Sequence, residues 1–233
     1  MKIFVIGDIH GAYKALLQCF ERSGFDYKKD RLIVLGDICD GYAEVKQCID
    51  ELLKIKHCDF VIGNHDLWTL DWATKDLKRE LWVKQGGLNT MASYGKEGMP
   101  QAHVNFLKNA HAYLEFNNKL FVHGGFDHRI PISKQGLQTL VWDRDLLDRA
   151  LKTHWTDPDF KFAGYDEIYI GHTTTQMYKS LKPLHFCNVW DLDTGAGWSG
   201  KLTIMNIKTK KYWQSDLSLE LYGGTPDQIW RRG

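Results

Sequence analysis

The sequence predicts an α/β fold that begins with a parallel sheet. Short apolar runs of strand length lack polar alternation, which is typical of strands buried on both faces. Segments with a helical spacing of apolar residues separate the first three runs, and this β-α-β-α-β order indicates parallel pairing. At 233 residues, the chain is long enough to bury one sizeable core without disulfides.

Five apolar runs account for the expected strands of the sheet. The runs lie at residues 2–6, 31–35, 59–62, 119–122 and 167–170. Between the first three, apolar positions recur at helical spacing over residues 13–23 and 42–56. We expect each of these two segments to form a helix that buries one face.

The second half of the chain predicts local strand pairing. Asn117 and Asn118 stand between two strand-like runs and suit a two-residue hairpin turn. Thr209 and Lys210 occupy the same kind of position between the runs KLTIMNI and KYWQS. We therefore expect antiparallel pairs there, beside the parallel strands.

No repeat, low-complexity tract or linker divides the chain, so we expect a single domain over residues 1–233. Residues 67–111 have a mostly helical pattern, broken by the glycine-rich segment QGGLNTMASYG. We expect this insertion to form a cap. Its tryptophans, Trp68, Trp72 and Trp82, have an alternative interpretation as core residues, because large aromatic side chains are usually buried.

Composition excludes several classes of protein. The 30 Lys and Arg residues against 29 Asp and Glu residues leave a formal charge of +1, which argues against general nucleic-acid binding. The five cysteines are widely spaced without a CxxC motif, so neither a disulfide framework nor a Cys-based zinc site is indicated. No apolar run approaches the ~18 residues of a membrane span. We expect a cytoplasmic protein without a membrane partner, and the sequence makes no prediction of its oligomeric state.

Polar side chains follow each of the five buried runs. The motifs are GDIHG, GDICDG, GNHD, HGG and GHT, in this order along the chain. In an open α/β sheet, ligands bind beyond the carboxyl ends of the strands, so the five segments can bring their side chains to one place. The candidates are Asp8, His10, Asp37, Asp40, Asn64, His65, Asp66, His123 and His172.

Each motif has an ordinary structural alternative, because a lone Asp after a strand is often a turn or cap residue and a lone His is often packed or solvated. Together they favour a metal centre, since so many buried ionisable groups are costly without cations. Asp, His and Asn ligands suit manganese, iron or zinc. Six such ligands exceed what one tetrahedral ion needs and suit two ions that share a carboxylate and clamp phosphoryl groups.

The ordered motifs resemble those of the calcineurin-like metallophosphoesterases, and within them the phosphoprotein phosphatase branch with its bacterial and phage members. The likeness extends over most of the chain and includes the segments QGGLNTMASYG, LVWDRDLL and IYIGHTTTQMYKSLKPLHFCNVWDLDTGAGWSG. It implies a four-layer α-β-β-α sandwich of two mixed sheets flanked by helices, with a dinuclear metal site at the strand C-terminal ends.

The resemblance also implies a role for each candidate ligand. Two divalent ions are expected as cofactors, with manganese favoured and iron or zinc as alternatives, and a water or hydroxide between them as the nucleophile. The implied ligands are Asp8 and His10 for the first ion, Asp37 as the bridge, and Asn64, His123 and His172 for the second.

Two further residues match the acid chemistry of the family. His65 is implied as the general acid that protonates the leaving alkoxide. Asp40 would orient the imidazole and hold its charge. Cys39, between the two acidic residues of GDICDG, has no such role in the family, and we expect it to pack in the core.

The phosphate contacts depart from the family pattern. The phosphatase branch usually has an arginine at the position of Gly41, so one half of the expected phosphate clamp is missing. Arg144 matches the second family arginine and is expected to bind substrate phosphate beside Asn64; a surface ion pair with Asp143 or Asp145 is its alternative. Restoring an arginine at position 41 would raise activity if the loop tolerates a Cβ atom. If Arg144 were not the clamp, Arg79 or a lysine of the insertion would be next.

The remaining candidates receive structural roles. Asp193 and Gly195 match a family segment near the site, and we interpret them as a scaffold for the last strands. Six histidines have no motif around them and are expected to be structural or solvated. They are His57, His103, His111, His128, His154 and His185.

The resemblance implies a phosphomonoesterase that acts on phosphoserine or phosphothreonine in proteins. Its partner would be a phosphorylated protein or a small phosphate ester. Relatives with the same site cleave dinucleoside polyphosphates, nucleotides or nucleic-acid ends, and the missing arginine is compatible with such a shift. A non-catalytic protein-binding scaffold is the contrasting hypothesis; it predicts eroded ligands, and all six are present.

Overall fold

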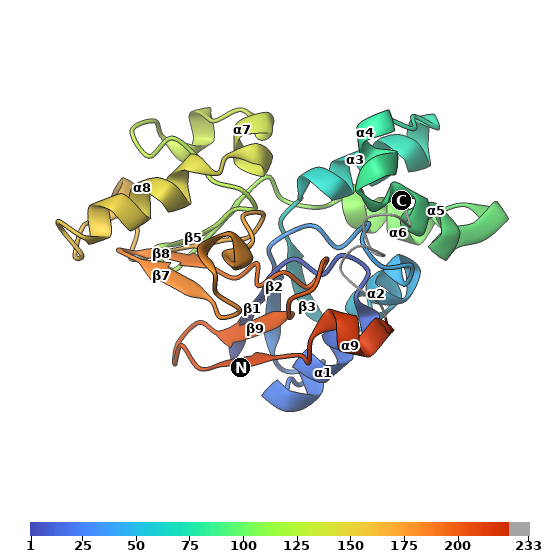
Figure 1. Ribbon diagram of the computed structural model, residues 1–233, viewed down its shortest axis with the longest axis horizontal. Helices are drawn as coiled ribbons and strands as arrows, with labels where there is room; N and C mark the ends of the chain where they lie inside the picture. Colours follow the sequence, from blue (N-terminus) through green and yellow to red (C-terminus); the bar gives the residue numbers. More distant parts are fainter. Residues whose placement is uncertain (224–233) are drawn as a thin grey trace.

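Two five-stranded mixed sheets lie face to face at the centre of the computed structural model, which describes residues 1–223 (Figure 1). The first sheet contains, in spatial order, β10 (Tyr212–Gln214), β9 (Thr203–Asn206), β1 (Ile3–Ile6), β2 (Arg31–Val34) and β3 (His57–Phe60). The second contains β4 (Leu114–Phe116), β5 (Lys119–Phe121), β6 (Glu167–Ile170), β8 (Val189–Asp191) and β7 (Leu184–Phe186).

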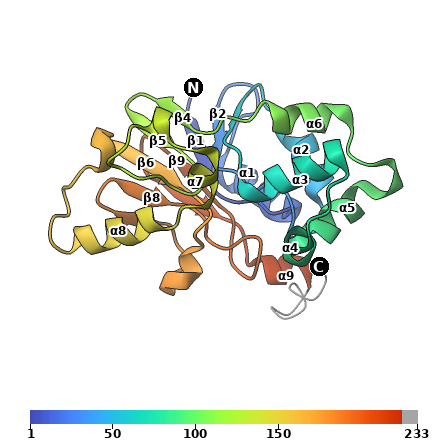
Figure 2. The ribbon, with the colours of Figure 1, turned by 90° about the horizontal axis from the view of Figure 1, so that it is seen from above.

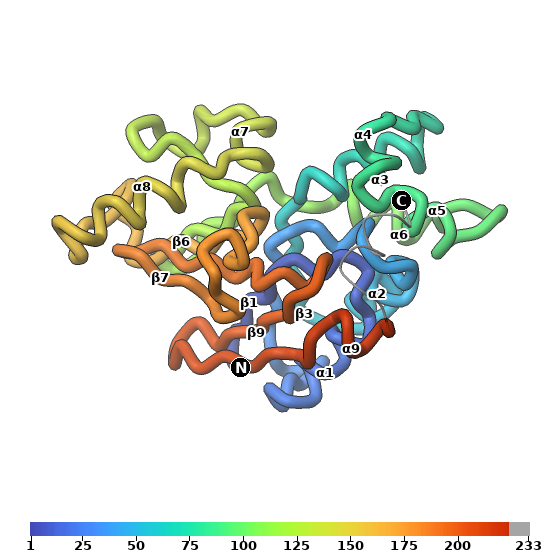
Figure 3. Tube along the Cα trace, viewed as in Figure 1, coloured from blue at the N-terminus to red at the C-terminus, as the bar shows by residue number. Residues whose placement is uncertain are grey.

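Each sheet contains three neighbouring parallel strands. In the first, β1, β2 and β3 are parallel, while β9 returns from the far end of the sequence to pair antiparallel with β1 (Figure 3). In the second, β5, β6 and β8 are parallel, and β4 and β7 are antiparallel edges. The carboxyl ends of the parallel strands are the positions at which ligand side chains are expected.

Helices cover the two outer faces of the sheet pair. The α-helices of the described residues are α1 (Tyr13–Ser23), α2 (Val45–Leu52), α3 (Asn64–Lys75), α4 (Glu80–Trp82), α5 (Leu88–Tyr94), α6 (Gln101–Lys108), α7 (Leu137–Trp142), α8 (Asp145–His154) and α9 (Ser218–Tyr222). Seen from above, α8 lies on one side and α2, α3 and α6 lie on the other (Figure 2). Among residues 1–223, none of the helices is both long and apolar enough to cross a membrane.

Alternation along the central strands creates three apolar layers. In β1, Phe4 and Ile6 pack on the helices, whereas Val5 joins a cluster between the sheets. That inner cluster also contains Phe121 and Tyr169, whose rings stack with centroids 5.0 Å apart. Because both faces of each sheet are buried, the strands lack polar alternation in sequence. The four-layer α-β-β-α prediction is confirmed.

Several local predictions differ in detail from the structure. The third strand spans residues 57–60 rather than 59–62, since Val61 has left the ladder and bridges to His111. Asn117 and Asn118 form the predicted two-residue turn, both with positive φ. The last hairpin has a longer turn than predicted, because residues 207–211 separate β9 from β10.

Candidate metal centre

A cavity of about 500 Å³ opens at the carboxyl ends of the central strands. The predicted residues that line it are Asp8, His10, Asp37, Asn64, His65, Arg144 and His172. His123 lies directly behind the cavity wall, fully buried, within hydrogen-bond distance of Asn64. Asp40 is also fully buried and contacts His65. The structure thus brings all the predicted site residues together from loops that follow β1, β2, β3, β5 and β6, and from the start of α8.

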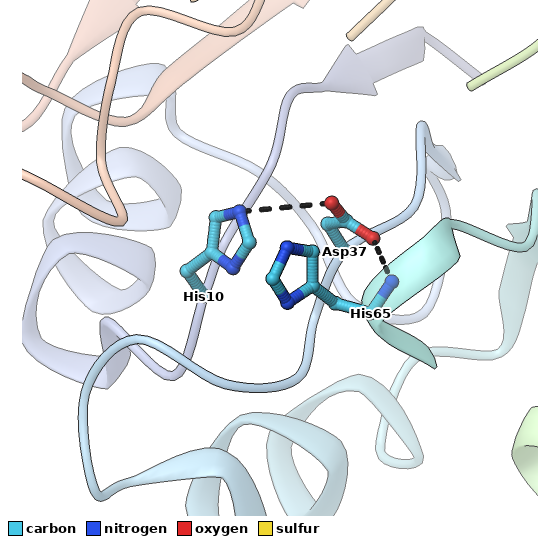
Figure 4. A group of neighbouring side chains, drawn as sticks. All are labelled: His10, Asp37 and His65. Atoms are coloured by element: carbon cyan, nitrogen blue, oxygen red, sulfur yellow. Dashed lines mark hydrogen bonds and ion pairs between the residues drawn. The ribbon is translucent and has the colours of Figure 1, made fainter. Parts of the chain in front are cut away.

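Asp37 is at the centre of this group. Its Oδ2 lies 3.7 Å from His10 Nε2 and 3.3 Å from His123 Nε2. Its Oδ1 accepts a hydrogen bond of 2.9 Å from the backbone N–H of His65. Figure 4 shows the carboxylate between His10 and His65. Two groups could each hold a metal ion, and both contain Asp37: one with His10 and His65, the other with His123 and His172.

The ring orientation of two histidines is set by backbone carbonyls. His10 Nδ1 lies 2.9 Å from the carbonyl oxygen of Cys39, and His123 Nδ1 lies 2.8 Å from that of Leu35. With Nδ1 donating to a carbonyl, Nε2 of each ring faces Asp37. This is the usual arrangement of metal-binding imidazoles. It also explains the position of Cys39, which is fully buried as expected and contributes its backbone.

Two buried ligand atoms have no hydrogen-bond partner in the described chain. They are Oδ1 of Asp8 and Nε2 of His172. Burial, followed by the nearby charge of Asp193, raises the pKa of Asp8 well above its ordinary value. Burial and the neighbouring His123 lower the pKa of His172 to about 2. A carboxylate oxygen and a neutral imidazole nitrogen left unpaired in a polar cavity fit a divalent cation.

His65 and Asp40 form a hydrogen-bonded pair beside Asp37. His65 Nδ1 lies 2.7 Å from Asp40 Oδ2. Burial would lower the pKa of His65, but the negative charges of Asp37 and Asp40 outweigh it and raise the pKa to about 9. Both carboxylates thus favour the protonated form of the ring.

Backbone strain is concentrated in the loops of the site. Four candidate residues have positive φ values: His10 at 47°, Asp37 at 46°, Asp40 at 69° and His172 at 63°. Non-glycine residues adopt this region at a cost, and such residues cluster at functional sites. Asp66 of the GNHD motif holds two of these loops together, because its carboxylate accepts hydrogen bonds from the backbone of residues 38, 39 and 63.

Arg144 lies at the exposed edge of the cavity. Its Nη1 donates a hydrogen bond of 3.1 Å to the carbonyl oxygen of His172, which ties the side chain to the ligand loop. The alternative ion pair is not formed within residues 1–223: Asp145 pairs with Arg149, and Asp143 accepts from the backbone of residue 146.

Two of the alternative clamp residues, Arg79 and one lysine of the insertion, form ion pairs and do not line the cavity. Arg79 pairs with Asp71 at 3.0 Å, and Lys84 pairs with Glu80. The segment of the insertion that does line the cavity carries Gln85.

Two residues that the sequence did not indicate as site residues donate hydrogen bonds to the Asp40 carboxylate. Trp82 donates its indole N–H and Thr90 donates its hydroxyl to this carboxylate, and both side chains are fully buried. The tryptophan is therefore a core residue as well as a site residue. Its position next to QGG was visible in the sequence, but no local pattern indicates a partner 42 residues away.

The other cavity-lining residues were also missed or given different roles. Asp193, interpreted as a scaffold, lines the cavity and accepts a hydrogen bond from the backbone N–H of Gly195. The remainder of the wall is formed by Trp142, Thr174, Gln176, Met177, Trp198 and Ser199. The six histidines expected outside the site do not line this cavity.

Comparisons with known proteins agree with this geometry. A family model described as calcineurin-like phosphoesterase matches residues 1–224. The chain is 27% identical to serine/threonine-protein phosphatase 1 of Salmonella typhimurium, over 88% of this chain and 92% of the relative. It is 22% identical to an asymmetrical bis(5'-nucleosyl)-tetraphosphatase of Oceanobacillus iheyensis, over 91% of each. A solved structure provisionally assigned as a diadenosine tetraphosphatase has the same fold, with a TM-score of 0.69 at 15% identity over 91% of this chain and 92% of that one.

Proposed function

The chain belongs to the calcineurin-like phosphoesterase family, and on this premise we propose that it is a metal-dependent phosphomonoesterase that acts as a serine/threonine protein phosphatase. The convergence of ligand side chains on Asp37, with unpartnered atoms on Asp8 and His172, carries this proposal. A likeness to a named serine/threonine phosphatase over 88% of the chain supports the choice of substrate.

The ligand set divides around Asp37. Asp8 and His10 would hold one divalent ion with Asp37, and a second would be held by Asp37 with three further residues. These are Asn64, His123 and His172. Bound ions supply Lewis-acid charge that activates water and clamps phosphoryl oxygens. Manganese is favoured, with iron or zinc as alternatives, because the donors are carboxylate, amide and imidazole groups.

The protein side chains perform the proton transfer and the orientation of the substrate. His65, protonated and paired with Asp40, would donate the Nε2 proton to the leaving alkoxide. Arg144, at the edge of the cavity, would bind the phosphoryl oxygens together with the Asn64 amide. Interactions that strengthen in the transition state accelerate the reaction, and these residues would act on the charge that develops there.

A dinucleoside polyphosphatase is the second candidate. Two indole rings, of Trp142 and Trp198, line the same cavity and offer surfaces for a nucleobase. The neutral Gly41 in place of an arginine also weakens the selection for a phosphomonoester dianion. The similarity to a named tetraphosphatase over 91% of the chain favours the same alternative.

A substrate panel tests the proposal. Purified protein reconstituted with Mn²⁺ would be assayed on a phosphoserine peptide, a phosphothreonine peptide, diadenosine tetraphosphate and a nucleoside monophosphate, with metal content measured in parallel. We expect the highest kcat/KM on the phosphopeptides. A higher value on diadenosine tetraphosphate would replace the first candidate with the second, and inactivity of the fully metallated protein on every ester would refute both.

A further inference from the structure

We propose that Trp82 and Thr90 are positioning residues for the general acid His65. Through these two side chains the helical insertion holds the Asp40 carboxylate, which in turn orients the His65 ring. The inference rests on the proposed function, because it assumes that His65 protonates a leaving group. The insertion, which the sequence predicts to form a cap, would thus also orient a catalytic residue.

The hydrogen bonds around Asp40 carry this inference. The Trp82 indole N–H lies 2.8 and 2.9 Å from the two carboxylate oxygens. The Thr90 hydroxyl donates to Oδ1 at 2.6 Å, and its oxygen accepts from the Asp40 backbone N–H at 2.9 Å. Oδ2 also lies 2.7 Å from His65 Nδ1. Donors from two different turns of the insertion thus fix the carboxylate in the orientation that holds the imidazole.

Close packing at two glycines makes this approach possible. A Cβ on Gly87 would lie 2.5 Å from the Trp82 ring, and a Cβ on Gly86 would lie 2.5 Å from the backbone nitrogen of Gly41. Gly86 also has a φ of 102°, which side-chain-bearing residues rarely adopt. The QGG segment is therefore shaped to rest on the loop that carries Asp40.

The proposed proton transfer requires a fixed orientation of the His65 ring. As the oxygen of the attacking water bonds to phosphorus, the P–O bond to the leaving group breaks, and its electron pair passes to the leaving oxygen, which takes the proton from His65 Nε2. The Nδ1–H stays on the hydrogen bond to Asp40, and the proton released by the attacking water restores the imidazolium. If Asp40 rotates, the ring loses its orientation and Nε2 no longer faces the leaving group.

Two conservative variants test the inference. Trp82→Phe removes the indole N–H but keeps an aromatic ring, and Thr90→Val removes the hydroxyl but keeps the shape. Each should lower kcat on a phosphoserine peptide about tenfold or more, in the range for losing a group that orients a catalytic residue, with KM and metal content unchanged. The loss should be much smaller on an aryl phosphate, whose leaving group needs no proton. Trp213→Phe, in β10 and away from the cavity, is the matched control.

A second comparison separates positioning from general damage to the fold. Adding either substitution to His65→Asn should cause no further loss, because the group being positioned is already absent. Equal losses on both substrates, or a further loss in the His65→Asn background, would overturn the inference, as would full activity of both variants. A misfolded Trp82→Phe would leave Thr90→Val to decide it. A metallated wild type that hydrolyses no phosphomonoester would instead refute the proposed function, and this inference with it.

Discussion

A Cβ atom on Gly41 would lie 2.7 Å from both the Cβ and the carbonyl oxygen of His10. Gly41 also has a φ of 70°, in the left-handed region that favours glycine. The arginine that the family usually has at this position therefore does not fit this loop. An arginine at position 41 was expected to raise activity only if the loop tolerates a Cβ atom, and the loop has no room for one.

We expect Gly41→Arg to lower activity, and Gly41→Ala to do the same to a smaller extent, because both would displace His10, a proposed metal ligand. The left-handed backbone alone should cost about 1–2 kcal/mol. Gly24→Ala is the matched control, since Gly24 has a φ of 62° but no atom within 4 Å of a built Cβ. Urea denaturation and metal content would be measured for all three. A Gly41→Arg variant with raised activity and normal metal content would show that the loop rearranges.

Removal of metal should abolish activity. Because two candidate metal groups share Asp37, we expect close to two divalent ions per chain. Treatment with a chelator should eliminate phosphatase activity, and Mn²⁺ should restore it. Elemental analysis and activity would be followed in the same samples. Full turnover by a preparation shown to be metal-free would contradict the proposed mechanism.

His65→Asn should keep the metals and lose the acid. The backbone N–H of His65 donates a hydrogen bond of 2.9 Å to Asp37, so the substitution leaves that contact in place, and the proposed ligands of both ions remain. We expect turnover on a phosphoserine peptide to fall by roughly 10²–10⁴. The fall should be much smaller with an aryl phosphate. Equal losses on the two substrates would count against an acid role.

Arg144→Ala should lower turnover by about 10² or more, the range for removing one well-placed charge stabiliser. Because position 41 is a glycine, it supplies no second guanidinium to bind the substrate phosphate together with Arg144. Arg149→Ala is the control, because Arg149 pairs with Asp145 and Asp127 outside the cavity. Steady-state kinetics and competitive inhibition by inorganic phosphate would be compared. Unchanged kinetics on every substrate would make Arg144 a surface residue.

Glu167 should contribute stability that depends on pH. Its carboxylate pairs with Lys119 at 2.5 Å and with Lys210. Burial would raise the pKa of Glu167, but these lysines outweigh it and the pKa is lowered from 4.5. Burial lowers the pKa of Lys210 in turn, so the net gain is modest, about 1 kcal/mol.

The sign of this effect follows from the lowered pKa. From pH 4.5 to neutral pH, where the lysines are charged, the wild type should exceed Glu167→Gln in free energy of unfolding, and the difference should vanish as the pH falls through the lower pKa of the folded state. Urea denaturation at neutral and acid pH would measure it. Glu21→Gln, at an exposed site, is the control. A difference that grows on acidification would refute the assignment.

The parts of the fold that the sequence predicts well depend on neighbouring residues. Helix α1 spans the predicted residues 13–23, since one face repeats at helical spacing. The turn at Asn117 and Asn118 follows from the tolerance of asparagine for positive φ. The turn of the last hairpin was less well predicted, because Asn206 and Lys210 close a wider loop through their own hydrogen bonds.

The sequence by itself determined which side chains gather at the cavity. Asp8, Asp37 and Asn64 follow parallel strands of the first sheet, and His123 and His172 follow parallel strands of the second, so each group lies at one edge of its sheet. The packing of the two sheets brings the groups to one cavity. The motifs were therefore sufficient to predict which candidate ligands lie near one another.

Only the tertiary structure decided what stands behind that site. The contact of Trp82 with Asp40, the exclusion of a side chain at Gly41 by His10, and the placement of Gln85 on the cavity wall join segments that no local pattern pairs. Hydrogen-bond direction and close packing depend on how the insertion docks on the loop after β2. That docking is set by the sum of many side-chain contacts rather than by the spacing of residues along the chain.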